Sequence, residues 1–245
     1  MILSNNQPRF CHNKSVETNL LEAYNIITKL LDAGIPVALI ILDLAKLFDK
    51  VPHRRFHIKV LSASLTQTTV NRLICCLTKY MQRVRLFGSI GQKIYSKLCT
   101  VISHVPKGTA FGRTLFRIYI NYIVTGFSNN IILFADDFKL FGLADSLSLQ
   151  ADLNHIQKWA ERWLPSFNIS KCSVLHFGPK NENTVYSMWN PDKLTKIDLQ
   201  THNEERALGV LAPNQLKFHF QARNVVSKSN ARLGLLKRSI SNRSP

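Results

Sequence analysis

Two short apolar segments that adjoin carboxylates constrain the fold of this 245-residue chain most strongly. Residues 37–42 form a continuous apolar run that ends at Asp43. Because the run is short and partly β-branched, it favours a strand buried on both faces over a helix. Residues 131–141 place two apolar arms around Asp136 and Asp137, which predicts a β-hairpin with its turn at the acids.

The segments around these strands have helical spacing. Apolar residues recur at this spacing in segments 20–31, 115–122 and 149–163, and the stretch from Pro52 to Tyr80 is expected to be mostly helical. Short strands are expected within 83–101, separated at Gly88 and Gly91, and at 173–177. The order predicts an α+β fold, with a sheet that carries helices on one face.

The charge of the chain is strongly positive and unevenly distributed. Lys and Arg number 32 against 15 Asp and Glu, which gives a net charge of +17. No carboxylate lies between Asp49 and Asp136, and a second acid-free run follows Glu205. A basic surface that serves only solubility is one explanation, but mixed charges would serve that purpose. The pattern favours a phosphate backbone as the partner.

Several other classes of protein are disfavoured. The five cysteines are odd in number and lack C-x-x-C spacing, so they indicate neither a disulfide framework nor a structural zinc site. No segment approaches the roughly 20 apolar residues of a membrane span, and residues 1–10 lack the apolar core of a signal peptide. We therefore expect a nuclear or cytoplasmic protein without a membrane partner.

The acids at the ends of the apolar strands predict a metal site. Burial of a carboxylate costs several kcal/mol unless a partner compensates, and Mg²⁺ or Mn²⁺ suits hard oxygen ligands. If the strands are neighbours, the carboxylates of Asp43 and Asp136 should lie within about 8 Å of each other, as a two-metal site requires. The alternative is structural, because Asp is also a common turn residue and Asp136 and Asp137 could serve only the turn.

Four ordered motifs in the chain resemble those of reverse transcriptases from non-LTR (LINE-type) retrotransposons. They are ILDLAKLFDKVPH at 41–53, VISHVPKGT with LFRIYIN at 101–121, FADD at 134–137, and the segment from Trp163 to Cys172 that contains FNISKC. The lead-in NQPRF with TNLLE, and the later LGV and LGLLKR, also resemble the family. The resemblance covers nearly the whole chain.

This resemblance implies a right-hand polymerase palm, built on an antiparallel sheet with helices on one face, together with partial fingers and the start of a helical thumb. Residues 1–180 would form the reverse-transcriptase-like domain, with a fingers-side helix in 1–36 and the palm motifs in 37–180. Residues 181–245 would form the end of the palm and the start of the thumb, with a basic tail. The implied reaction is two-metal transfer of dNTPs to a primer 3′ end, with an RNA template and a DNA primer as partners.

The resemblance also assigns catalytic roles by motif position. Asp43 and Asp136 would be the metal-binding pair with Asp137 beside them, and the Leu44 carbonyl would be an additional ligand for one Mg²⁺ or Mn²⁺ ion. Lys171 would protonate the leaving pyrophosphate. The ordinary alternative for Lys171 is a solvated surface lysine.

Nucleotide-binding roles follow in the same way, together with three departures from the family. Phe48 would lie under the incoming sugar, and Gly108 would let the backbone approach the nucleotide. Lys107 stands where the family has Gln, and Leu47 is larger than the family's small residue. His104 replaces a family Gly, which is tolerable only if its φ is negative.

In the family, a basic fingers region that grips the triphosphate precedes the lead-in, and this sequence begins after that point. We therefore expect weak or undetectable polymerisation from the isolated chain. The main alternative is a catalytically inactive remnant that binds nucleic acid through its basic surface. A structural or protein-interaction domain is a third possibility, which the charge and the strand-end acids disfavour. The sequence leaves the oligomeric state open.

Overall fold

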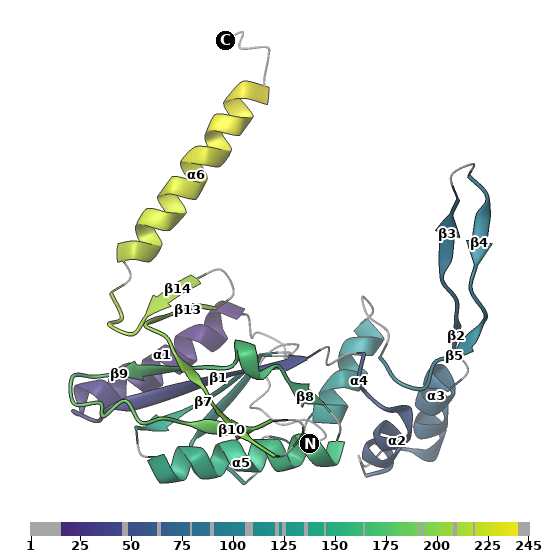
Figure 1. Ribbon diagram of the computed structural model, residues 1–245, viewed down its shortest axis with the longest axis horizontal. Helices are drawn as coiled ribbons and strands as arrows, with labels where there is room; N and C mark the ends of the chain where they lie inside the picture. Colours follow the sequence, from purple (N-terminus) through teal and green to yellow (C-terminus); the bar gives the residue numbers. More distant parts are fainter. Residues whose placement is uncertain are drawn as a thin grey trace.

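The computed structural model of the chain describes residues 16–45, 49–62, 65–78, 80–88, 91–105, 110–120, 123, 126–134, 137–144, 146–163, 165–190, 192, 194–207, 210–217 and 219–239. Its centre is a six-stranded sheet (Figure 1). The strands follow the order β12 (Gln200–Thr201), β9 (Ser173–Phe177), β1 (Val37–Ala45), β7 (Asp137–Leu143) and β6 (Asn130–Phe134), and β8 (Ser166–Phe167) pairs with the end of β1. The sheet is mixed and not wholly antiparallel as predicted, because the short edge strand β12 pairs parallel with β9, whereas the other pairs are antiparallel.

The predicted central strand and hairpin are confirmed, but Asp137 is the first residue of β7 and not part of the turn, where it was predicted. β1 lies between β7 and β9, and most of its side chains are buried, as a continuous apolar run requires. The β6–β7 hairpin pairs Phe134 with Asp137, so residues 135 and 136 connect the two strands. The register of β1 on β7 runs from Val37 opposite Leu143 to Asp43 opposite Asp137. The acids of both segments therefore come to the same end of the sheet.

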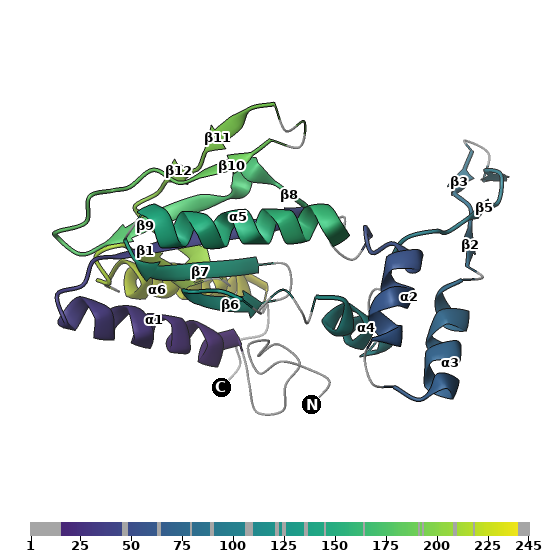
Figure 2. The same ribbon diagram turned by 90° about the horizontal axis from the view of Figure 1, so that it is seen from below.

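Helices cover both faces of the sheet, not one face as the sequence predicted. Helix α1 (Val16–Asp32) packs on the face that contains Leu39 and Phe141, while α5 (Ser146–Trp163) packs on the face that contains Ile40 and Leu140. Figure 2 shows the sheet between these two helices. The physical reason lies in β1 itself, because a strand that is apolar at consecutive positions needs cover on both sides. The α+β class itself is confirmed.

Three helices extend the core beyond the end of β1. The predicted helical stretch after Pro52 is two helices, α2 (His53–Leu61) and α3 (Gln67–Leu77), and Thr66 caps α3 by accepting from the Thr69 backbone N–H. Helix α4 (Ala110–Ile120) packs on α2, where Phe56 and Phe116 are both buried. Together these helices form the base of a protruding arm.

The arm consists of the short strands that were predicted within 83–101. They are β2 (Met81–Gln82), β3 (Arg85–Phe87), β4 (Lys93–Tyr95) and β5 (Cys99–Thr100). β2 pairs with β5 and β3 pairs with β4, so the chain makes one narrow hairpin. The side chains of all four strands are exposed, and the hairpin projects away from the helices (Figure 1).

The C-terminal part adds small strands and one long helix. A short 3₁₀ turn, η2 (Ile169–Lys171), precedes β9, and β10 (Ser187–Trp189) with β11 (Lys196–Asp198) follows it. The hairpin of β13 (Glu204–Ala207) and β14 (Val210–Pro213) leads to α6 (His219–Ser239). None of the described helices is long and apolar enough to span a bilayer.

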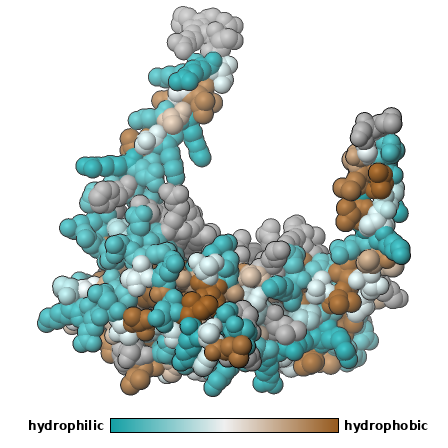
Figure 3. Space-filling view, in the orientation of Figure 1, coloured by the Kyte–Doolittle hydropathy of each residue, from teal (hydrophilic) through white to brown (hydrophobic). Residues whose placement is uncertain are grey.

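Helix α6 and the arm give the molecule its shape. Both project to the same side of the body, and the end of β1 lies between them (Figure 1). The space-filling view shows a broad hollow between the two projections (Figure 3). α6 carries basic side chains along its length, namely Arg223, Lys228, Arg232, Lys237 and Arg238. One of the two projections that border the hollow is therefore a helix rich in basic residues.

Candidate active site at the end of β1

Asp43 lies near the end of the central strand, where several elements meet. Its side chain is 25% exposed, although its strand neighbours Leu42 and Leu44 are buried. Its backbone carbonyl accepts a hydrogen bond of 2.9 Å from the Asn168 N–H. The turn that precedes β9 is therefore fixed beside Asp43, and the carboxylate keeps access to solvent.

Asp43 and Asp137 are direct partners across the antiparallel pair of β1 and β7. Residues in such a pair project to the same face, with Cβ atoms about 4.5–5.5 Å apart. In general, two carboxylates in such a cross-strand pair would repel each other unless a cation lay between them. Asp136, which was predicted to share this site, lies outside the described residues. Its predicted distance of about 8 Å from Asp43 therefore stays a prediction. For Asp137 the structure describes only the backbone, as the first residue of β7.

Lys171 approaches the same carboxylate from the 3₁₀ turn. Its Nζ lies 3.6 Å from Oδ2 of Asp43, and its side chain is 66% exposed. An ion pair this open contributes little to stability. Its position still places an ammonium group beside the carboxylate of Asp43, which the sequence predicted as a site residue.

The other predicted site residues divide into two groups. Leu44 is described: its side chain is buried, and the residue pairs with Phe167 of β8. Phe48, Lys107 and Gly108 lie outside the described residues, and so does the departure Leu47. Their predicted roles at the nucleotide therefore stay predictions.

A metal ion would suit the donors at this end of the sheet. No group of three or more His, Cys, Asp or Glu residues that could hold a metal is present in the described part of the chain. The described donors do include a partly exposed carboxylate, Asp43, directly opposite a second aspartate. Hard oxygen ligands of this kind fit Mg²⁺ or Mn²⁺ better than zinc.

Cys172 is next to this site but is not suited to be a nucleophile. Burial is the main cause that raises the pKa of its thiol to about 11; a hydrogen bond to the Asp43 backbone lowers this pKa, and the charge of the Asp43 carboxylate raises it. A thiol with this pKa stays protonated at neutral pH, and the thiolate is the reactive form. Its Sγ instead donates to the Asn168 carbonyl, which helps to hold the turn in place.

A buried ion pair near the site was not predicted from the sequence. Lys139 on β7 and Glu205 on β13 approach to 2.9 Å, with side chains only 8% and 10% exposed. Lys139 is the partner of Ile41 on β1, two residues before Asp43, so it projects to the same face of the sheet as Asp43. The pair therefore ties the β13–β14 hairpin to the face that carries Asp43. A lysine inside the otherwise apolar run of 138–141 was the available signal.

His104 has a strained backbone at the position where the family has glycine. Its φ is +140°, a conformation that favours glycine, whereas a histidine would be tolerated without strain only at a negative φ. The surroundings hold it there, since its N–H donates to the Val51 carbonyl and its own carbonyl accepts from His53 Nε2. Its ring also lies 5.8 Å from the Tyr80 ring, edge to face.

Helix α2 carries a second unpredicted feature, a buried lysine. The Nζ of Lys59 lies 3.9 Å above the ring of Trp163, and its side chain is buried. Burial, and secondarily the charge of Arg162, lowers the pKa of Lys59 to about 8. The lysine therefore titrates well below its usual range.

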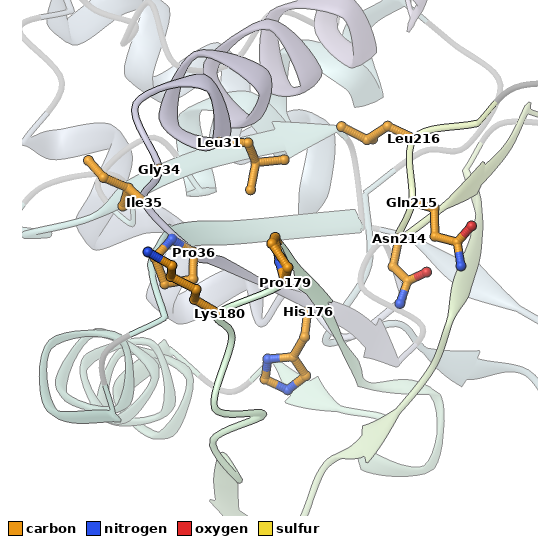
Figure 4. Close-up of a pocket in the computed structure, with 11 residues that line it drawn as sticks. Leu31, Gly34, Ile35, Pro36, His176, Pro179, Lys180, Asn214, Gln215 and Leu216 are labelled. Atoms are coloured by element: carbon orange, nitrogen blue, oxygen red, sulfur yellow. The ribbon is translucent and has the colours of Figure 1, made fainter.

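A pocket of about 530 Å³ lies at the opposite end of β1 from Asp43 (Figure 4). It is formed between the α1–β1 connection, the end of β9 and the segment after β14, and its walls include Leu31, Ile35 and Leu216 with the polar Lys180 and Asn214. None of the lining residues is an acid. The pocket is thus separate from the candidate active site and lacks its chemistry.

A known protein family and several solved structures match this chain. The sequence pattern of the family described as reverse transcriptase (RNA-dependent DNA polymerase) matches residues 1–220. No curated protein matches the chain significantly.

The similar solved structures include telomerases from Candida tropicalis. An apo form truncated from its C-terminal domain has a TM-score of 0.53 at 10% identity, over 86% of this chain and 40% of that one. A complex with a fragment of telomeric RNA has a TM-score of 0.53 at 11% identity, over 76% and 33%. The chain thus spans less than half the length of these telomerases, and at this identity the likeness concerns the fold alone.

Proposed function

Because the chain belongs to the reverse transcriptase (RNA-dependent DNA polymerase) family, we propose that it is the RNA-directed DNA polymerase domain of a non-LTR retrotransposon. Membership of the family implies a nucleotidyltransferase of this type. The retrotransposon origin is supported by the four ordered sequence motifs from residue 41 to residue 172. RNA template, DNA primer and dNTP would be the partners, and the hollow between α6 and the arm is the surface on which we place the nucleic acid (Figure 3).

One observation carries the proposal: Asp43 faces Asp137 across adjacent strands at the open end of the sheet. Asp43, Asp136 and Asp137 would hold Mg²⁺ or Mn²⁺, with the Leu44 carbonyl as a further ligand. The bound ions would activate the primer 3′ oxygen and stabilise the leaving phosphate oxygen. The chain's own residues would hold these carboxylates in place, since β1 and β7 fix their register and Asn168 fixes the backbone at Asp43.

Two further groups would act on the nucleotide. Lys171, 3.6 Å from Asp43, would donate a proton to the leaving pyrophosphate. Phe48, Lys107 and Gly108 would contact the sugar and phosphates of the incoming nucleotide. We retain the division into 1–180 and 181–245 as the proposed domain boundary, with α6 as the start of the thumb.

Primer extension by the full chain on an RNA template tests this function. We expect weak synthesis that requires Mg²⁺ or Mn²⁺ and is lost in Asp43→Asn and Asp136→Asn. The matched control is Asp198→Asn, because Asp198 is an exposed aspartate on β11. Direct Mn²⁺ binding, followed by electron paramagnetic resonance, should weaken in the same two variants and not in the control. Synthesis that persists in Asp136→Asn would refute the role of that residue.

The alternative is a catalytically inactive module that binds nucleic acid, and the strain at His104 favours it. Histidine at φ +140°, where the family has glycine, strains the backbone three residues before Lys107, and this would disfavour the nucleotide contacts proposed for Lys107 and Gly108. Chelation of the divalent ion separates the two functions. A polymerase and an inactive binding module would both still bind nucleic acid after the divalent ion is chelated. Only the polymerase would extend a primer while the ion is present, and chelation would stop this synthesis.

A further inference from the structure

The arm of residues 81–100 contains none of the residues that we assign to the proposed polymerase site. Its strands β3 and β4 pair in the register Arg85 opposite Tyr95 and Phe87 opposite Lys93. The pairing continues toward the base through hydrogen bonds between Val84 and Ser96. The arm is therefore a defined hairpin, although no strand of it is buried.

One face of the arm combines cations with aromatic rings. Because side chains alternate along a strand, the two pairs Arg85–Tyr95 and Phe87–Lys93 project to the same face. The guanidinium of Arg83 lies 4.1 Å from the centre of the Tyr95 ring, and that of Arg85 lies 5.1 Å from the Phe87 ring. Phe87 is 64% exposed and Tyr95 is 44% exposed, so both rings remain available to a ligand.

The other face of the arm is aliphatic. Leu86 and Ile94 are direct partners there, and they are 61% and 50% exposed. Figure 3 shows hydrophobic and hydrophilic groups together on this projection. The two faces therefore differ in chemistry and can be altered separately.

The charge of the arm is not neutralised locally. It carries the four cations Arg83, Arg85, Lys93 and Lys97, and the sequence contains no carboxylate from residue 50 to residue 135. Positive charge with interleaved aromatic rings is the chemistry by which proteins bind unpaired nucleic acid, since the charges hold phosphates while bases stack on the rings.

We propose that the basic and aromatic face of the arm binds single-stranded RNA or DNA, with unpaired bases stacked on Phe87 and Tyr95 and phosphates held by Arg83, Arg85, Lys93 and Lys97. In the proposed polymerase, this single strand would be the unpaired part of the template, and that identification rests on the proposed function. The binding itself does not, because the arm is separate from the aspartates at the end of β1.

Other partners fit the arm less well. A duplex keeps its bases stacked on each other, so the exposed rings would gain nothing from it. An acidic peptide would pair with the cations but would not stack on the rings. A membrane surface would contact Leu86 and Ile94 of the aliphatic face, and not the basic and aromatic face.

Fluorescence anisotropy with the full chain tests the proposal, using a 20-nucleotide oligouridylate and a 20-base-pair RNA duplex as probes. All titrations contain EDTA and no dNTP, so a failure of the polymerase function does not affect them. The test variant is Phe87→Leu with Tyr95→Leu, which keeps apolar bulk and removes the rings. The matched control is Leu86→Ala with Ile94→Ala on the opposite face.

We expect the ring variant to bind the single strand about ten- to a hundred-fold more weakly, because each base–aromatic stack contributes strongly. The affinity of the ring variant for the duplex should change less than about two-fold, because bases paired in a duplex cannot stack on the rings. The affinity of the control variant for either probe should also change less than about two-fold, because the control leaves the rings in place. A second variant, Arg83→Gln with Lys97→Gln, should reduce the log–log salt slope for the single strand by about 1.4. This measurement remains informative if the ring variant is poorly folded.

Three results would overturn the proposal. Unchanged single-strand affinity in both the ring variant and the charge variant would show that the arm is not a binding surface. Equal losses on the single strand and the duplex would show that stacking is not involved. Vesicle binding at 30% phosphatidylserine that is lost in the Leu86 and Ile94 control would identify a membrane contact instead.

Discussion

The Nζ of Lys139 on β7 lies 2.9 Å from Oε1 of Glu205 on β13, in a pair that is almost fully buried. The two residues are 66 positions apart in the sequence. The pair therefore connects the central sheet to the hairpin that leads into α6. Charges buried in this way cost free energy of desolvation, which is recovered only when both partners are present.

We predict that Glu205→Leu alone lowers the free energy of unfolding by about 3–5 kcal/mol, because it leaves the Lys139 ammonium buried without its partner. Adding Lys139→Met should restore most of this loss, since two apolar side chains can replace a buried pair. Urea denaturation followed by circular dichroism measures both. The exposed neighbour Glu204→Gln is the control, and it should stay within about 0.5 kcal/mol of the parent chain. A double variant as unstable as the single one would contradict this account.

Strain at His104 leads to an unusual prediction, in which a glycine stabilises the fold. At φ +140° a side chain with a Cβ costs about 1–3 kcal/mol, whereas glycine adopts this conformation freely. His104→Gly relieves this strain. The lost ring contact with Tyr80 and the higher entropy of the unfolded chain offset part of the gain, so we expect a net stabilisation of about 1 kcal/mol.

The matched comparison at this position is His104→Ala. It also loses the ring but keeps the Cβ, so it should be less stable than the parent chain. Thermal unfolding of the three proteins ranks them. Equal destabilisation by alanine and glycine would show that the backbone is not strained there.

The sequence predicted the centre of the molecule better than its surroundings. The apolar run at 37–42 and the acids at 136–137 follow local rules of burial and turn formation, so they identified the strand and the hairpin. The positions of α1 and α5 on opposite faces depend on how the chain crosses the sheet, which local periodicity does not encode. The pair Lys139–Glu205 needs the β13–β14 hairpin to fold back onto β7, and no local pattern contains this information.

The buried Lys59 predicts a rise in stability with pH. Its pKa is about 8 in the folded chain and 10.5 in the unfolded chain, so above pH 8 the unfolded state binds the extra proton and stability increases with pH. Cys172 acts in the opposite direction, because burial raises its pKa from 9.0 to about 11, and its effect falls mainly above pH 9. Between pH 8 and pH 9 the contribution of Lys59 is therefore the larger of the two.

Over this interval we expect the free energy of unfolding to rise by about 1 kcal/mol, since one pH unit corresponds to at most about 1.4 kcal/mol for one group. Urea titrations at pH 8.0, 8.5 and 9.0 measure it. Lys59→Met should abolish the rise, and Lys158→Met, at an exposed lysine of α5, should retain it. A flat profile in the parent chain would mean that Lys59 is not desolvated.

The two acid-free basic segments, residues 50–135 and the residues after Glu205 that include α6, predict binding to nucleic acid. We expect this binding to depend steeply on salt and little on sequence. If about six phosphates of a duplex are neutralised, the slope of log K against log salt should be near −5. Lys228→Gln with Arg232→Gln should make the slope less negative by up to about 2, since each lost phosphate contact removes about 0.9. Filter binding between 50 and 300 mM KCl measures the slope. Affinity that does not change with salt would exclude phosphate contacts as the main source of binding.

The ion pair of Lys171 with Asp43 predicts a separation of metal affinity from catalytic rate, if the proposed polymerase function holds. Lys171→Met removes a positive charge 3.6 Å from the Asp43 carboxylate, so Mn²⁺ should bind about two- to five-fold more tightly, in keeping with the small energy of an exposed pair. If Lys171 protonates the leaving pyrophosphate, the same variant should extend a primer at least about ten-fold more slowly. Lys171→Arg keeps the charge but holds its proton too firmly to donate it, so it should leave Mn²⁺ affinity unchanged and still lower the rate. Full activity in both variants would show that Lys171 is an ordinary surface lysine, whereas a lower rate in methionine but not in arginine would assign it a role through charge alone.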